Sequence, residues 1–197
     1  MKLDDKDFLN NILQELDSIG HIESADFPNI DLYMDQLTTF MEQQLKNTKR
    51  YADDKVLTKT MINNYAKNHV LPPPERKQYS TEHMLTLIFI YYFKNILSIT
   101  DIQKVLVPIQ EKYFDSKNFT MRDIYDEVFS MEPELMGQLK EDITTKYNQS
   151  TETFSHVSPK EQAYLQKFAF LCELCFDIYL KKHIVEKLID ELPDSSQ

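Results

Sequence analysis

The scarcity of glycine constrains this chain most. Its 197 residues include only two glycines, Gly20 and Gly137. The phosphate-binding loops of nucleoside triphosphatases and of dinucleotide-binding enzymes need several glycines at fixed spacing, because their backbone must approach a phosphate closely. Tight β-hairpins also favour glycine. The sequence therefore excludes these nucleotide-binding motifs and argues against a fold made of hairpins.

Apolar residues recur every three or four positions along most of the chain, and this spacing predicts a mainly α-helical protein. A first helix is expected over residues 8–19, with Gly20 at its C-terminal cap, and a second over 32–45. A short third helix over 57–68 precedes the triple proline at 72–74. The helix after Ser80 is apolar nearly all round, so it is expected at the centre of the core.

Further helices are predicted from their capping residues. Ser98 precedes Asp101 by three residues, and Thr120 precedes Asp123 in the same way. Ser158 is followed by proline and glutamate, which predicts a helix of roughly 30 residues toward position 192. Pro108 is expected to kink or interrupt its helix, and residues 148–158 are expected to form a loop. One small hairpin, a wing, is expected at residues 75–80.

The charge is distributed unevenly. The chain has 22 Lys and Arg against 32 Asp and Glu, a net charge of -10. Residues 45–80 reverse this balance with eight basic and three acidic residues, so that this window carries +5 and the remainder -15. A basic segment in an acidic chain is either an ordinary solvated surface or the contact surface for an anionic partner.

The short third helix has the pattern of a DNA-recognition helix. If Met61, Ile62 and Tyr65 face the core, the outward positions are occupied by polar and basic side chains, as base edges and phosphates require. Thr58 and Lys59 begin the helix, where phosphate contacts are favoured. The candidate contacts are Thr58, Lys59, Thr60, Asn63, Asn64 and Lys67 on the helix, with Arg76 and Lys77 on the wing.

The order helix, turn, short helix, basic wing, apolar helix resembles the winged helix-turn-helix of MerR-type regulators. "NNYAKNHVLPP" is similar to that family's recognition helix and the following leucine pair, and "RKQYS" resembles the end of its wing. The resemblance adds Tyr79 to the candidate contacts. His69 occupies a position where that family usually has glycine. "NIDLYMDQLTTFM" and "LTKTMINNYAK" are more closely similar to the YkrK family of small bacterial proteins of unknown function.

Other constellations give no catalytic, metal or cofactor site. Cys172 and Cys175 form a C-x-x-C pair without a second pair, so we expect buried core cysteines. A redox or metal sensor is the alternative. The five histidines do not cluster, and neither H-E-x-x-H nor G-x-S-x-G occurs, so no enzyme is expected. No signal peptide is visible and the longest apolar run is about half a membrane span, which favours a cytoplasmic protein.

The sequence thus predicts a mainly α-helical transcription regulator. Its expected parts are an N-terminal helix (1–26), a MerR-like winged helix-turn-helix (27–112) and an all-α C-terminal domain for dimerisation or sensing (113–197). The wide apolar face of the last helix fits packing within one chain or a homodimer interface. The expected partner is double-stranded DNA, with a homodimer and a small-molecule effector as further partners that the sequence allows, and no membrane. The alternative is a protein-binding adaptor that uses the same helix-turn-helix face without DNA.

Overall fold

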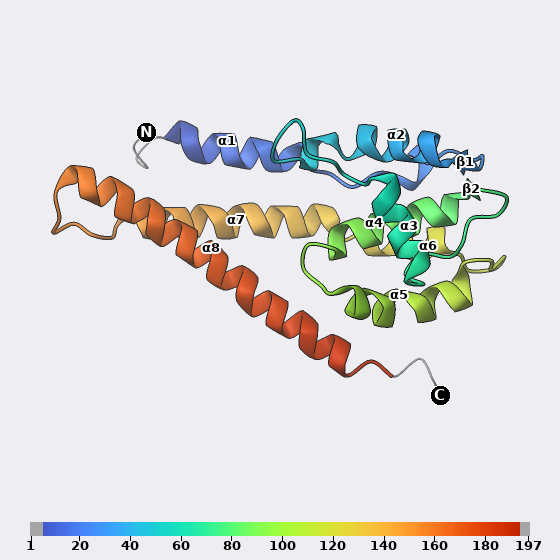
Figure 1. The fold of residues 1–197 in the computed structure, drawn as a ribbon. Helices are drawn as coiled ribbons and strands as arrows, with labels where there is room; N and C mark the ends of the chain where they lie inside the picture. Colours follow the sequence, from blue (N-terminus) through green and yellow to red (C-terminus); the bar gives the residue numbers. More distant parts are fainter. Residues whose placement is uncertain (1–5, 194–197) are drawn as a thin grey trace. The chain divides into compact units, whose positions relative to one another are not determined.

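A computed structural model describes residues 6–193. Residues 1–5 of the expected N-terminal segment and 194–197 of the expected C-terminal domain lie outside that range. The expected mainly α-helical fold with a small β element is confirmed (Figure 1). The contacts divide the chain into one unit of residues 21–130 and 186–197, and another of residues 1–20 and 131–185. None of the helices within residues 6–193 has the combined length and apolarity that crossing a bilayer requires.

The unit of residues 21–130 has the order of a winged helix-turn-helix. A short strand, β1 (Leu32–Tyr33), leads into α2 (Met34–Gln44), and α3 (Lys59–Lys67) follows. Strand β2 (Gln78–Tyr79) precedes α4 (Thr81–Phe93), α5 (Ile99–Tyr113) and α6 (Met121–Phe129). Two single 3-10 turns, Ser24–Asp26 and Lys46–Thr48, complete it. Helix α6 packs on α4, and the unit extends to residue 130.

Helix α4 is the centre of this unit, as its apolar sequence predicts. Eight consecutive residues from His83 to Ile90 are buried, so every face of the helix is covered. Tyr125 of α6 closes one side: its ring packs on Phe27, Phe89 and Phe129, and its hydroxyl donates a 2.6 Å hydrogen bond to the carbonyl of Ile22. This buried contact fixes the start of the unit on α6, about 100 residues later in the chain.

The small sheet differs from the expected hairpin. Strand β2 pairs antiparallel with β1, with Leu32 opposite Tyr79 and Tyr33 opposite Gln78. Within residues 75–80, the only strand-like pairing is a single antiparallel bridge between Glu75 and Gln78. The amide of Gln78 donates a 2.7 Å hydrogen bond to the Glu75 carbonyl, which makes a tight two-residue turn at the wing tip. The wing is therefore held by a strand that precedes α2.

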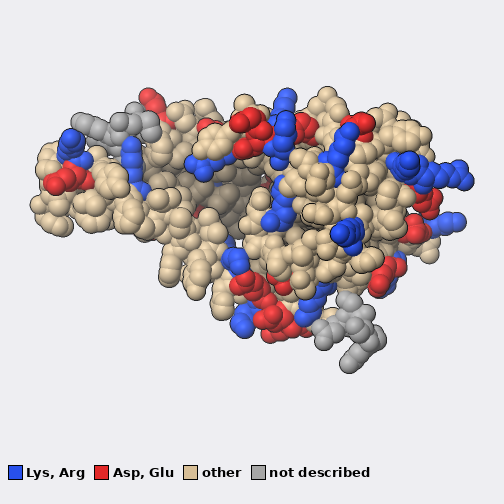
Figure 2. All heavy atoms as spheres, in the orientation of Figure 1, with Lys and Arg blue, Asp and Glu red and all other residues tan. Residues whose placement is uncertain are grey.

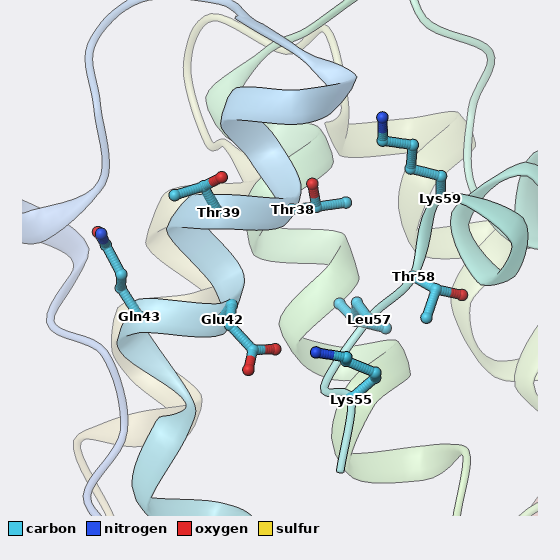
Figure 3. A pocket seen from close by; sticks show the side chains of 8 residues that line it. All are labelled: Thr38, Thr39, Glu42, Gln43, Lys55, Leu57, Thr58 and Lys59. Atoms are coloured by element: carbon cyan, nitrogen blue, oxygen red, sulfur yellow. The ribbon is translucent and has the colours of Figure 1, made fainter. Parts of the chain in front are cut away.

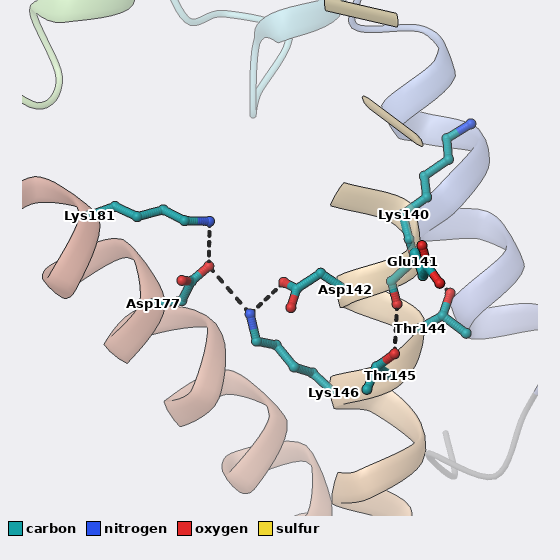
Figure 4. Close-up of polar contacts among 8 residues, drawn as sticks. All are labelled: Lys140, Glu141, Asp142, Thr144, Thr145, Lys146, Asp177 and Lys181. Atoms are coloured by element: carbon teal, nitrogen blue, oxygen red, sulfur yellow. Dashed lines mark hydrogen bonds and ion pairs between the residues drawn. The ribbon is translucent and has the colours of Figure 1, made fainter. Parts of the chain in front are cut away.

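The second unit contains α1 (Lys6–Asp17), α7 (Glu132–Thr151) and the first 27 residues of α8 (Pro159–Asp190). Its core is formed by Ile143, Tyr147 and Phe170, with apolar side chains of α1 packed against them. Lys146 of α7 reaches across to α8, where its ammonium pairs with Asp177 at 3.3 Å (Figure 4). The same lysine pairs with Asp142, and Lys181 pairs with Asp177 at 2.9 Å.

Several local expectations are corrected. Helix α1 ends at Asp17, and Gly20 does not adopt a positive φ, so it is not a left-handed cap. Helix α5 continues through Pro108, so the proline does not interrupt it. Helix α7 extends to Thr151, so the loop that was expected from residue 148 is shorter. Cys172 and Cys175 are exposed, because the face of α8 that carries them points away from α7.

Candidate nucleic-acid interface

Helix α3 is fixed at both ends by its own sequence. The Thr58 hydroxyl accepts a 3.2 Å hydrogen bond from the amide of Met61, which caps the first turn. At the other end, the amide of His69 donates to the Ala66 carbonyl (3.1 Å) and that of Val70 to the Tyr65 carbonyl (2.9 Å). This pair of bonds is a Schellman motif, with His69 in the left-handed region at φ 53°.

The inner face of α3 is buried as expected. Ile62 is fully buried and Tyr65 is 8% exposed, and both belong to the core of this unit. Burial also raises the pKa of the Tyr65 hydroxyl. Met61 packs at the edge of the same core. These anchors determine which side of the helix faces solvent.

The outer face of α3 carries the predicted polar residues. Lys59, Thr60, Asn63, Asn64 and Lys67 are all exposed. Within residues 6–193, the side chains of Asn63, Asn64 and Lys67 have no hydrogen-bond or ion-pair partner, and neither does the Thr60 hydroxyl. The structure thus brings together one row of donors and acceptors, at i, i+3, i+4 and i+7, that is available to an external partner.

Lys59 and Thr58 differ from that row because each has an internal partner. Lys59 forms an ion pair with Asp35 in the first turn of α2, and both side chains are more than half exposed. The hydroxyl oxygen of Thr58 accepts the hydrogen bond that caps α3, but its hydroxyl hydrogen can still be donated to an external acceptor. An external phosphate would compete with Asp35 for Lys59.

A shallow groove separates α2 from the start of α3 (Figure 3). It encloses about 490 Å³ and is lined by Thr38, Thr39, Glu42, Gln43, Lys55, Leu57, Thr58 and Lys59. Figure 3 shows Lys55 on the wall opposite α2, with its side chain pointing toward Glu42. The Glu42 carboxylate already accepts from Lys49, and this hydrogen bond lowers the pKa of Glu42. The groove therefore contains two lysines, several hydroxyl and amide side chains, and the Glu42 carboxylate, whose negative charge is already paired with Lys49.

Sequence reasoning named only Thr58 and Lys59 of the groove residues and missed the other six, Thr38, Thr39, Glu42, Gln43, Lys55 and Leu57. Thr39 and Gln43 are four residues apart, so they share one exposed face of α2. From that spacing the sequence could have predicted a polar face on α2. It could not predict which face of α2 lies beside α3, since this depends on how the two helices pack.

The wing tip presents two basic residues in a strained backbone. Arg76 and Lys77 are exposed, with φ of 48° and 66°. Two consecutive positive φ values define the type I′ class of turn, which normally selects Asn and Gly. Here the positions are occupied by long cationic side chains that have no ion-pair partner within residues 6–193. Backbone strain of this kind is common at functional sites.

Tyr79 does not belong to the contact surface. It is only 3% exposed, and its ring packs edge-to-face on His83 at 5.4 Å. As the partner of Leu32 in the sheet, it points into the core. The resemblance had suggested Tyr79 as a DNA contact, and this expectation is corrected to a packing role.

The surface of this unit is mixed in charge. Figure 2 shows Lys and Arg side chains projecting on the side where Figure 1 labels β1 and β2, with acidic side chains among them. A second hollow of about 460 Å³ lies behind the wing and is distinctly acidic, with Asp31, Glu75, Glu82 and Asp115 around the buried His83. Among the described residues, no group of three or more His, Cys, Asp or Glu is placed to hold a metal ion.

The chain belongs to the DUF1836 family, which is described as a domain of unknown function and matches residues 22–128. The matched stretch contains α2, α3, the wing and every candidate contact residue. No curated protein and no solved structure matches the chain.

Proposed function

We propose that this protein is a sequence-specific DNA-binding transcription regulator. The observation that carries the proposal is the outer face of α3, where Thr60, Asn63, Asn64 and Lys67 have no side-chain partner within residues 6–193, while the inner face is anchored in the core. A recognition helix in a helix-turn-helix has this division, because it enters the major groove with one face and packs with the other.

Each part of the surface has chemistry suited to one part of a duplex. Asn63 and Asn64 each offer a donor and an acceptor, the pair that reads the major-groove edge of adenine. Lys67 suits guanine or a phosphate. At the start of α3, Lys59 and the hydroxyl of Thr58 suit phosphate oxygens, which fix the register of a protein on DNA.

The wing and the groove extend this surface. Arg76 and Lys77 at the turn suit the backbone or an adjacent groove. Lys55, on the wall of the groove between α2 and α3, adds a cation near Lys59. These contacts carry little sequence information and supply the salt-dependent part of the affinity.

The acidity of the rest of the chain acts against binding. Outside residues 45–80 the net charge is -15. This charge repels a duplex from other surfaces, which favours one binding orientation and lowers the overall affinity. We therefore expect moderate affinity that falls steeply with salt.

The test is fluorescence anisotropy of the full chain against duplex DNA from upstream of its own gene and a scrambled duplex, across a salt series. The variant Asn63→Ala, Asn64→Ala, Lys67→Ala removes the outer face of α3. A matched control, Asn10→Ala, Asn11→Ala, Lys160→Ala, removes the same number of each side-chain type from exposed positions of α1 and α8. Circular dichroism verifies that both variants are folded.

We expect preference for the native duplex, loss of that preference in the α3 variant and retention in the control. The α3 variant should also have a shallower dependence of affinity on salt, by about one unit of slope for the lost lysine. Absence of binding to either duplex at low salt, with the protein folded, would overturn the proposal. The adaptor that binds a protein through this face would then be the better hypothesis.

A further inference from the structure

We propose that α8 pairs with α8 of a second copy of this chain through a stripe of apolar side chains that faces away from α7. The inference concerns the unit of residues 1–20 and 131–185, and it does not depend on DNA binding. The stripe consists of Tyr164, Phe168, Leu171, Cys175 and Ile178, which we call the α8 stripe.

The inner face of α8 is already used within the chain. Phe170 packs edge-to-face on Tyr147 of α7 at 5.7 Å. Gln166, which is nearly buried, donates a 2.6 Å hydrogen bond to the Thr151 carbonyl. Asp177 pairs with Lys146. These positions, 166, 170 and 177, define the side of α8 that α7 covers.

The α8 stripe occupies the opposite side. Successive members are separated by four, three, four and three residues, which is the heptad spacing of a coiled-coil seam. Tyr164 is 71% exposed, Phe168 52%, Leu171 56% and Ile178 65%. Cys175 is exposed as well. The next seam position is Lys182, so the apolar stripe stops there.

The stripe is large enough to be an interface. Cys172 and Tyr179, the latter 64% exposed, flank it and widen the apolar surface. At roughly 100 Å² of exposed surface per side chain, these seven residues present on the order of 700 Å². Each partner of a stable interface of standard size buries about 800 Å². An apolar patch of this extent on a free monomer is unusual and marks an interaction site.

A second copy is the occupant that fits the stripe. A heptad seam is complementary to another heptad seam, because the knobs of one helix enter the holes of the other. The stripe is also self-complementary about its centre at Leu171, as a two-fold interface requires. Cys172, which flanks the stripe, and Cys175, which belongs to it, both lie within about one helical turn of that centre, so the thiols of two paired copies come close to one another.

The test compares two single variants of α8. Ile178→Glu places a charge in the stripe, and Ile184→Glu places the same charge at a similarly exposed residue (59%) on another face of the helix. Sedimentation equilibrium without DNA gives the mass of the full chain, whose monomer is 23.4 kDa. We expect a dimer for the wild type and for Ile184→Glu, and a dissociation constant raised by about tenfold or more for Ile178→Glu.

A short bismaleimide crosslinker gives an independent readout. It should produce a covalent dimer of the wild type through Cys172 and Cys175, and none with Ile178→Glu or with Cys172→Ser, Cys175→Ser. A monomeric wild type, or a dimer that Ile178→Glu leaves intact, overturns the proposal. Equal weakening by both glutamate variants also overturns the assignment to this face. None of these results bears on the DNA-binding proposal, because DNA is absent.

Discussion

Lys59 in the first turn of α3 forms an ion pair with Asp35 in the first turn of α2. The pair is exposed, so it contributes at most about 1 kcal/mol to the free energy of folding. Its greater effect concerns binding, because Asp35 neutralises a lysine at the place where a phosphate is expected. Asp35→Asn should therefore tighten DNA binding by about two- to fivefold at low salt, which corresponds to the energy of such a pair.

Fluorescence anisotropy checks this expectation. Asp17→Asn is the matched control, since Asp17 is another exposed carboxylate paired with a lysine, Lys140, in the other unit. The control should change affinity less, because its charge is not beside α3. Unchanged affinity of Asp35→Asn would show that Lys59 does not contact the duplex.

The wing tip predicts opposite changes in stability and in binding. Replacing Arg76 and Lys77 by Asn and Gly gives the turn the residues that tolerate two positive φ values. We expect the free energy of unfolding to rise by about 1 kcal/mol, because the strain is relieved. We expect DNA affinity to fall, because two cations are removed.

Arg76→Gln, Lys77→Gln separates the two effects. This variant removes the charge and keeps the unfavourable backbone, so it should lose affinity without gaining stability. Urea unfolding and anisotropy on the three proteins provide the comparison. If the Asn-Gly variant is no more stable than the wild type, the turn is not strained in the way that its φ angles indicate.

We predict that replacing His69 with glycine stabilises the protein without changing the charge of α3. His69 holds the left-handed position of the Schellman motif, where a side chain is unfavourable by about 1 kcal/mol relative to glycine. His69→Gly should raise the melting temperature by about 2–4 °C. His69→Ala is the control and should give no comparable gain, because alanine has the same steric conflict. Thermal unfolding monitored by circular dichroism measures both.

His83 predicts that acid destabilises the winged unit. Burial lowers the pKa of this histidine below its ordinary value of 6.5, and this effect exceeds the opposing influence of Glu82 and Asp31. Its Nδ1 accepts a 3.0 Å hydrogen bond from the Ser80 amide, which requires the neutral ring. As pH falls below about 6.5, the unfolded chain binds a proton that the folded chain does not, so stability decreases.

His83→Gln provides the comparison, since glutamine also serves as the third residue of a capping box but does not titrate. Between pH 7.5 and 5.5, the wild type should lose more free energy of unfolding than the variant. Urea denaturation at each pH measures this difference. Parallel pH profiles of the two proteins would show that His83 is not the source of any acid sensitivity.

The helix boundaries are among the features that local sequence predicts. The caps at Ser98, Thr120 and Ser158 were predicted because each involves groups only three residues apart, and the structure contains all three. The central position of α4 was likewise predictable, since a helix that is apolar on every side must be surrounded. The buried and exposed faces of α3 followed from the spacing of Met61, Ile62 and Tyr65.

Contacts between distant segments were not predictable in the same way. The pairing of Leu32 with Tyr79 joins strands far apart in the sequence, and Tyr79 is buried in the core there. The Asp35–Lys59 pair depends on how α2 packs beside α3. Cys172 and Cys175 were expected in the core because they lie on an apolar face, yet α7 covers the other side of α8.

The sequence by itself determined most of the helices, the N-terminal caps at Ser98, Thr120 and Ser158 and the residue types presented by α3, because these depend on interactions within a few residues. Only the tertiary structure decided which strand holds the wing, which lysine is already paired and which face of α8 is uncovered. These features depend on the packing of segments that are far apart in the chain. A side chain of α8 has the same local pattern whether it faces α7 or solvent, so periodicity alone cannot distinguish the two.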